Sequence, residues 1–129
     1  LIGKAHRARI AGESGMEIWG TGTPRREFLH VDDCADAIVF LMKTYSDMGH
    51  VNVGSGEDLT IKHLAREIMD VVGLDGELRH DLSKPDGTPR KLMSAEKLRS
   101  MGWSPKIGLR EGLEDAYRWY LDHVSEEAA

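Results

Sequence analysis

Residues 23–33, TPRREFLHVDD, carry the clearest local fold signal in the chain. The first of them form a turn, and residues 26–31 read as a short strand. Asp32 or Asp33 then offers an N-cap, because a short side-chain oxygen can accept the free backbone N–H groups of a first helical turn. The apolar pattern over residues 34–47 continues as a helix with a broad apolar face. A turn, a strand and a capped helix in direct succession predict an α/β fold.

Helices and strands are predicted to alternate on both sides of this stretch as well. Thr60 and Gly73 flank an apolar stripe of helical period and predict the two caps of one helix. Further helices are expected over residues 1–13, 94–102 and 109–124, and strands over residues 16–19, 51–54 and 76–82. No repeat or low-complexity segment interrupts this order, and residues 125–129 read as a frayed tail. We therefore expect one α/β domain over residues 1–124.

Length and composition limit the class of protein. With 129 residues, 40% of them hydrophobic and 30% charged, the chain suits one globular domain that folds without disulfides or metals. No apolar run approaches the length that crosses a bilayer, and a net charge of -5 argues against a general nucleic-acid binder. Cys34 is the only cysteine, which favours a reducing, cytoplasmic setting. We expect neither a membrane nor a nucleic acid as partner.

Residues 83–91, SKPDGTPRK, resemble the first stretch in their chemistry. Both place Lys or Arg beside proline on expected loops. A guanidinium group matches two anionic oxygens, while proline fixes the backbone that approaches the ligand. Such loops suit a diphosphate, so the chain is predicted to bind a phosphorylated small molecule.

These two stretches, together with IWGTG at residues 18–22 and HVNVGSG at residues 50–56, resemble the C-terminal part of the GDP-L-fucose synthase family. That family belongs to the extended short-chain dehydrogenase/reductase superfamily, and the resemblance runs almost from end to end. The block REFLHVDD has close variants in other nucleotide-sugar epimerases and dehydratases, whereas the loop KPDGTPRK is the narrower signal. Another GDP- or UDP-sugar epimerase or dehydratase stays open as an alternative, as does a non-catalytic nucleotide-binding module.

Two features of that family are not found in the chain. The glycine pairs at residues 20–22 and 54–56 do not extend to the third glycine of the dinucleotide fingerprint, and no tyrosine has a Lys four positions later. The chain also starts at Leu1. We therefore expect the C-terminal substrate-binding part of a Rossmann-type enzyme, with the N-terminal dinucleotide-binding domain absent. Elements around residues 32–56 would pack on that domain, so an exposed apolar patch is expected at Ile38, Leu41, Met42 and Tyr45.

The resemblance implies an activity for the complete enzyme. It would epimerise carbons 3 and 5 of GDP-4-keto-6-deoxymannose and then reduce carbon 4 with hydride from NADPH. The groups that catalyse these steps, and most of the NADPH site, would lie upstream of Leu1. This fragment alone would hold the GDP-sugar in place without catalysis. A homodimer is implied for the full-length protein.

Five residues are candidates for substrate binding. Arg26 matches a substrate-binding Arg of the family and follows a proline-constrained turn; its alternative role is a surface ion pair with Glu27. Trp19, Lys4 and Asp86 match further substrate positions, and their alternative roles are core packing, a solvated helix cation and a turn residue. Asp86 would accept hydrogen bonds from ribose, sugar or base donors. Lys91, with its neighbour Arg90, can neutralise phosphate charge.

The remaining candidates are given structural roles. Arg25 is expected to be solvated, and Trp103 and Trp119 are expected to pack. His30 is expected to be a hydrogen-bonded core histidine, since no second histidine lies at metal-ligand spacing. No metal site is predicted.

Overall fold

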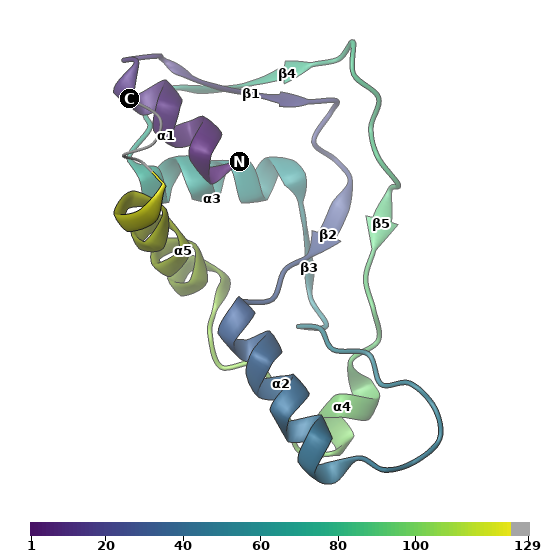
Figure 1. Ribbon diagram of the computed structural model, residues 1–129. Helices are drawn as coiled ribbons and strands as arrows, with labels where there is room; N and C mark the ends of the chain where they lie inside the picture. The colour runs from purple at the N-terminus through teal and green to yellow at the C-terminus, as the bar shows by residue number, and fades with distance from the viewer. Residues whose placement is uncertain (125–129) are drawn as a thin grey trace.

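The computed structural model describes residues 1–124, and the predicted tail at 125–129 lies outside them. Figure 1 shows the helices and strands along the chain. The elements are α1 Ile2–Ile10, β1 Gly15–Trp19, β2 Arg25–Glu27, α2 Val31–Thr44, β3 Asp58–Thr60, α3 Ile61–Val72, β4 Glu77–Asp81, β5 Arg90–Lys91, α4 Glu96–Ser100 and α5 Leu109–His123. The mixed order confirms the predicted α/β class. No described helix has the length and apolarity needed to cross a membrane.

Two small sheets organise the backbone. β1 and β4 form a parallel pair along the upper edge of Figure 1, with Trp19 opposite Asp81 at its end. β2 is the centre of the second sheet, antiparallel to β3 and parallel to β5. Because β2 follows β1 directly, the second sheet begins a few residues after Trp19.

The larger hydrophobic core lies among α1, α3, α5 and the β1–β4 pair. The apolar stripe of α3 is buried there: Leu64, Ala65, Ile68, Met69 and Val72. The hydroxyl of Thr60 accepts the backbone N–H of His63, and Gly73 ends the helix in the left-handed conformation. Both predicted caps are confirmed, because each depends on residues next to it in the sequence.

A second, smaller core joins α2 to α4 and the turn that follows α4. Its fully buried members are Ala37, Leu98 and Trp103, and the partly buried ones include Val51 and Val53. The indole N–H of Trp103 donates to Asp36 at 2.9 Å. Residues 51–54, predicted as a strand from their β-branched alternation, are not in a strand, since they pack on this core without a neighbouring strand to pair with.

The start of α2 also differs from its prediction. The strand expected over residues 26–31 ends at Glu27, and His30 is the N-cap, accepting the backbone N–H of Asp32 through Nδ1. Asp33 is buried and accepts the backbone N–H groups of Lys106 and Ile107. The carboxylate of Asp33, which the sequence predicted to cap α2, therefore binds a distant segment of the chain instead.

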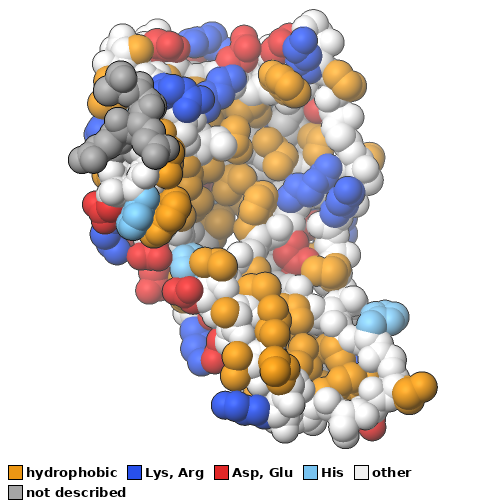
Figure 2. All heavy atoms as spheres, viewed as in Figure 1, with side chains coloured by type: hydrophobic (Ala, Val, Ile, Leu, Met, Phe, Trp, Pro, Cys, Tyr) orange, Lys and Arg blue, Asp and Glu red, His pale blue; other side chains and the backbone are white. Residues whose placement is uncertain are grey.

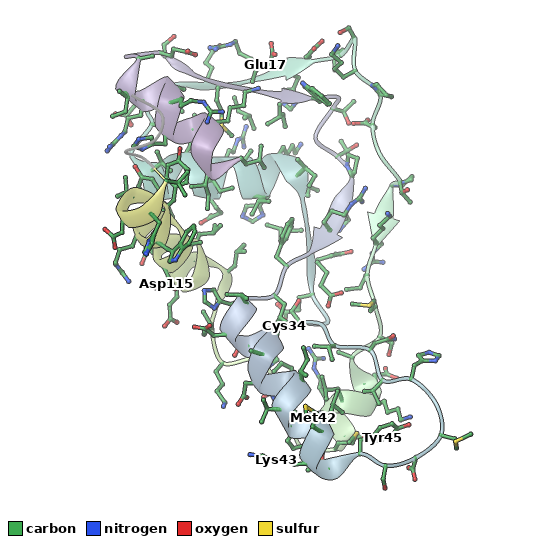
Figure 3. All side chains as sticks on the ribbon, viewed as in Figure 1. Glu17, Cys34, Met42, Lys43, Tyr45 and Asp115 are labelled. Atoms are coloured by element: carbon green, nitrogen blue, oxygen red, sulfur yellow. The ribbon has the colours of Figure 1, made fainter. Side chains whose placement is uncertain are left out.

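One face of α2 is apolar and exposed. Apolar side chains follow this helix in the lower half of Figure 2, and Figure 3 labels Met42 among them. Ile38 is 50% exposed and Met42 is 80% exposed, as predicted. The prediction is wrong for Leu41, which packs on the second core, and for Tyr45, whose hydroxyl accepts a hydrogen bond from Lys97 at 2.7 Å. Val31 and Val39 complete the exposed stripe instead.

Candidate functional site

The second sheet separates its charges between two faces. On one face, Asp58 of β3 accepts the Nε–H of Arg25 at 2.8 Å and that of Arg90 at 2.5 Å. The hydrogen bond from Arg90, together with Arg25, keeps the pKa of the Asp58 carboxyl below its usual value. Arg25, predicted to be solvated, is instead half-exposed and ion-paired. On this face, the positive charges of Arg25 and Arg90 are paired with the carboxylate of Asp58.

The opposite face carries Arg26 and Lys91, which are register partners on the parallel strands β2 and β5. Side chains of such partners point to the same side of a sheet, and neighbouring strands lie about 4.8 Å apart. Among residues 1–124, neither cation forms an ion pair with a carboxylate. Within the described residues, the side chain of Arg26 donates to two carbonyl oxygens, those of Arg25 and Thr88, both at 2.7 Å from Nη1. Two neighbouring cations without a carboxylate partner in the described part of the chain could hold an anion between them.

Asp86 joins the turn after β1 to the loop after β4. Its two carboxylate oxygens accept the backbone N–H of Thr21 at 2.9 Å and the hydroxyl of Thr21 at 2.7 Å. Gly20 has φ +68°, and a Cβ atom there would collide with the Asp86 carboxylate. These contacts hold the residues after Trp19 against the loop, a role that the sequence did not predict for Asp86.

Trp19 is exposed on the same side of the molecule as this loop. Its side chain is 68% exposed at the end of β1, so it is not a core residue. The ammonium of Lys84 lies 5.8 Å from the ring centroid. Residues 82–89 therefore contact Trp19 through Lys84, Thr21 through Asp86, and Arg26 through Thr88. One loop connects four of the five candidates, because Lys91 follows it directly.

Lys4 is the fifth candidate and lies apart from this group. It is half-buried on α1 and lines a hollow of about 440 Å³ with Arg7, Glu17 and Arg79. Within the described part of the chain, it makes no contact with Arg26, Asp86 or Lys91. Glu17 and Trp19 both lie on the exposed side of β1, two residues apart, so the hollow that Glu17 lines is close to the indole in the strand.

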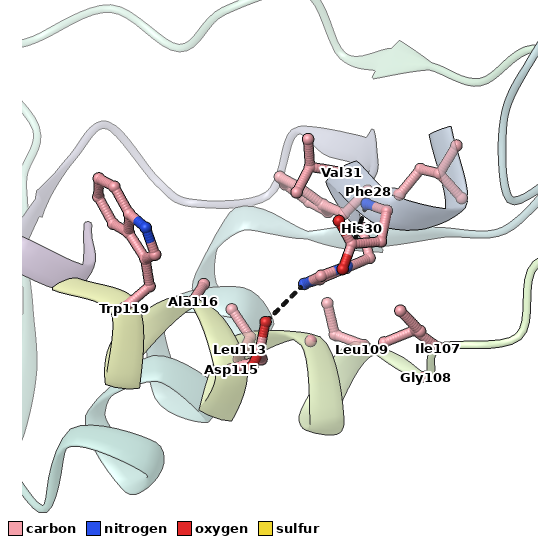
Figure 4. Close-up of a pocket in the computed structure, with 13 residues that line it drawn as sticks. Phe28, His30, Val31, Ile107, Gly108, Leu109, Leu113, Asp115, Ala116 and Trp119 are labelled. Carbon is pink, nitrogen blue, oxygen red and sulfur yellow. Dashed lines mark hydrogen bonds and ion pairs between the residues drawn. The ribbon is translucent and has the colours of Figure 1, made fainter. Parts of the chain in front are cut away.

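A separate apolar hollow of about 590 Å³ lies between the start of α2 and α5 (Figure 4). His30 is nearly buried at its edge, with Nε2 3.4 Å from an oxygen of Asp115. His30 is hydrogen-bonded as predicted, through Nδ1 to the N–H of Asp32, but it lines this hollow and is not a core residue. Trp119, expected to pack, is instead exposed over this hollow and stacks on His123. Within residues 1–124, no group of three possible metal ligands is found.

The comparisons with known proteins agree with this arrangement. Residues 1–54 match the NAD dependent epimerase/dehydratase family. The chain is 55% identical to the "Probable GDP-L-fucose synthase 1" of Oryza sativa subsp. japonica over 96% of its length, and 54% identical to "GDP-L-fucose synthase 1" of Arabidopsis thaliana over the same share. Residues 1–54 thus carry the sequence pattern of the NAD dependent epimerase/dehydratase family.

The chain spans 38% of the length of each of these two relatives. A solved structure, the GDP-mannoheptose C4 reductase from Campylobacter jejuni with NADP bound, matches over 93% of this chain and 43% of its own chain, with a TM-score of 0.79 and 36% identity. The expected fold class, part of a Rossmann-type epimerase/dehydratase, is therefore confirmed. Trp19 and Arg26 fall within the residues that match the family, whereas the loop with Asp86 and Lys91 lies beyond them.

Proposed function

We propose that this chain is the GDP-sugar-binding part of a GDP-L-fucose synthase. The observation that carries the proposal is the pair of uncompensated cations, Arg26 and Lys91, on one face of the second sheet. The names of the relatives support a GDP-sugar as the ligand. The complete enzyme would act on GDP-4-keto-6-deoxymannose, epimerising carbons 3 and 5 and reducing carbon 4.

Each candidate has a role that its geometry allows. Arg26 and Lys91 bind the diphosphate, and the guanidinium keeps Nε and Nη2 for phosphate oxygens while Nη1 holds Thr88. Trp19 packs its exposed ring against a sugar or base. Asp86 fixes the turn at Thr21 and leaves its remaining lone pairs for a ribose or sugar hydroxyl. Lys4 adds positive charge from α1, from the hollow that it shares with Glu17 of β1.

NADPH would supply the hydride for the reduction, but the described residues do not fit it. The Gly20–Thr21–Gly22 turn connects two strands rather than a strand to a helix. The Asp86 carboxylate lies against Gly20 and would repel a pyrophosphate there. We therefore assign NADPH to other residues of the full-length enzyme. A homodimer and a cytoplasmic setting remain proposals for that enzyme.

We also propose that the exposed stripe of α2 packs against the rest of the full-length protein, as expected from the resemblance for residues 32–56. The chain spans 38% of its relatives, and a monomer seldom exposes such an apolar row without a partner.

Introducing a charged side chain into this stripe should therefore reduce the exposed hydrophobic surface without disturbing the fold. Met42→Lys is expected to lower the fluorescence of a bound apolar dye such as ANS at least twofold. Arg66→Lys on the exposed side of α3 is the control and should leave it unchanged. Equal dye binding by both variants would show that the stripe is covered in the chain itself.

Calorimetric titration with GDP and UDP tests the proposed ligand. GDP should bind more tightly than UDP, and both should compete with inorganic pyrophosphate for the cation pair. A preference for UDP would instead favour another nucleotide-sugar epimerase or dehydratase. Absence of binding by either nucleotide would contradict a GDP site formed by this chain.

A further inference from the structure

Asp58 is nearly buried at the junction of three strands. Its side chain is 4% exposed, with Oδ1 on Arg25 of β2 and Oδ2 on Arg90 of β5. Arg25 also donates from Nη2 to the backbone carbonyl of Asp58 at 2.8 Å. One carboxylate of β3 thus bridges the central strand and the edge strand.

Among the described residues, the edge strand β5 has no ion pair other than the one between Arg90 and Asp58. It consists of Arg90 and Lys91, both exposed, and follows an exposed loop. Three hydrogen bonds flank β5: the N–H of Arg25 donates to the carbonyl of Pro89 at 2.8 Å, Arg26 donates to the carbonyl of Thr88 at 2.7 Å, and the N–H of Met93 donates to Glu27 at 3.2 Å. A strand of two residues forms few ladder hydrogen bonds, so the ion pair with Asp58 is expected to contribute to its pairing with β2. Without Asp58, two neighbouring guanidinium groups would also repel one another across the two strands.

We propose that Asp58 is a positioning residue for diphosphate binding: by bridging Arg25 and Arg90 on one face of the sheet, it holds Lys91 beside Arg26 on the other. This inference rests on the proposed function, because the separation of the two cations matters only if they bind one anion together. Asp58 itself points away from that anion and does not touch it.

The direction in which the loss of the Asp58 charge changes diphosphate affinity distinguishes a positioning role from a purely electrostatic one. By Coulomb's law alone, removing a negative charge from the neighbourhood of an anion site strengthens anion binding. Positioning has the opposite effect, since Lys91 moves away from Arg26. Asp58→Asn keeps the size of the side chain and removes the charge.

Two measurements on the 129-residue chain test this role. The first is hydrogen exchange of the segment 83–93, which should become faster in Asp58→Asn while α3 keeps its protection. The second is titration with GDP and with inorganic pyrophosphate, in which Asp58→Asn should bind both about 5- to 20-fold more weakly. Asp75→Asn removes an exposed carboxylate that makes no hydrogen bond or ion pair in the described residues, and should change neither. Arg90→Gln, which breaks only the link to β5, should speed exchange of the same segment.

A double-mutant cycle separates positioning from general loss of structure. In a Lys91→Ala background, Asp58→Asn should cause no further loss of affinity, because the residue that it places is gone. An equal loss in both backgrounds, or binding that stays the same or tightens, would overturn the proposal. If the parent chain binds neither ligand, the proposed function fails, and hydrogen exchange alone decides about Asp58: unchanged exchange at 83–93 would refute its bridging role.

Discussion

Replacing Arg26 by alanine is expected to weaken GDP binding by roughly 10- to 100-fold. A hydrogen bond to a charged group contributes about 1.5–3 kcal/mol, and about 1.4 kcal/mol corresponds to tenfold in affinity. Arg26 has no carboxylate partner among residues 1–124, so its charge is available to the diphosphate. The variant also loses the bond to the carbonyl of Thr88, which loosens the loop that leads to Lys91. Calorimetric titration measures both effects together.

Two further variants separate charge from geometry at this position. Arg26→Lys keeps the charge without the planar fork, and should lie between the parent chain and Arg26→Ala. Arg66→Ala removes an exposed arginine of α3 that has no ion pair in the described part of the chain, and should bind GDP as the parent does. A loss in Arg66→Ala as large as that in Arg26→Ala would mean that only the overall charge matters.

The largest loss of stability is expected for Leu98→Ala. Leu98 is 0% exposed between α2 and α4, in contact with the core that includes Ala37 and Trp103. Truncation of a fully buried leucine lowers the free energy of unfolding by about 2–5 kcal/mol, since it loses apolar contacts and leaves a cavity. Denaturation with urea, followed by circular dichroism, measures this change.

Leu82→Ala is the matched control for that experiment. Leu82 is exposed after β4, so its truncation should change the free energy of unfolding by less than about 0.5 kcal/mol. A loss below about 1 kcal/mol in Leu98→Ala would contradict the account of a second core, because it would mean that α2 and α4 do not depend on each other.

The structural features that could be predicted best from the sequence are those that depend only on residues close together in the chain. The caps of α3 are formed by Thr60 and Gly73 themselves, so their residue types were sufficient. The start of α2 was misplaced because Asp33 is used by residues 106–107, far along the chain. The strands β3 and β5 were missed because two or three residues carry no period, and each forms only against β2.

At the candidate site, too, local features could be predicted and contacts between distant residues could not. Arg26 and Trp19 were predicted from a motif and a resemblance, and Trp19 is exposed while Arg26 is partly exposed. Asp86 was predicted to bind substrate, but its contact with Thr21 joins residues 65 positions apart and had no sequence signal. Asp58 was missed entirely, since only the strand register brings Arg25 and Arg90 to a single carboxylate.

A crystal structure of the chain with GDP tests the central claim most directly, namely that Arg26 and Lys91 together bind a diphosphate. The account predicts phosphate oxygens within hydrogen-bond distance of both side chains, with a ring of the ligand against Trp19. A diphosphate bound elsewhere, for example in the hollow beside His30 and Trp119, would contradict it.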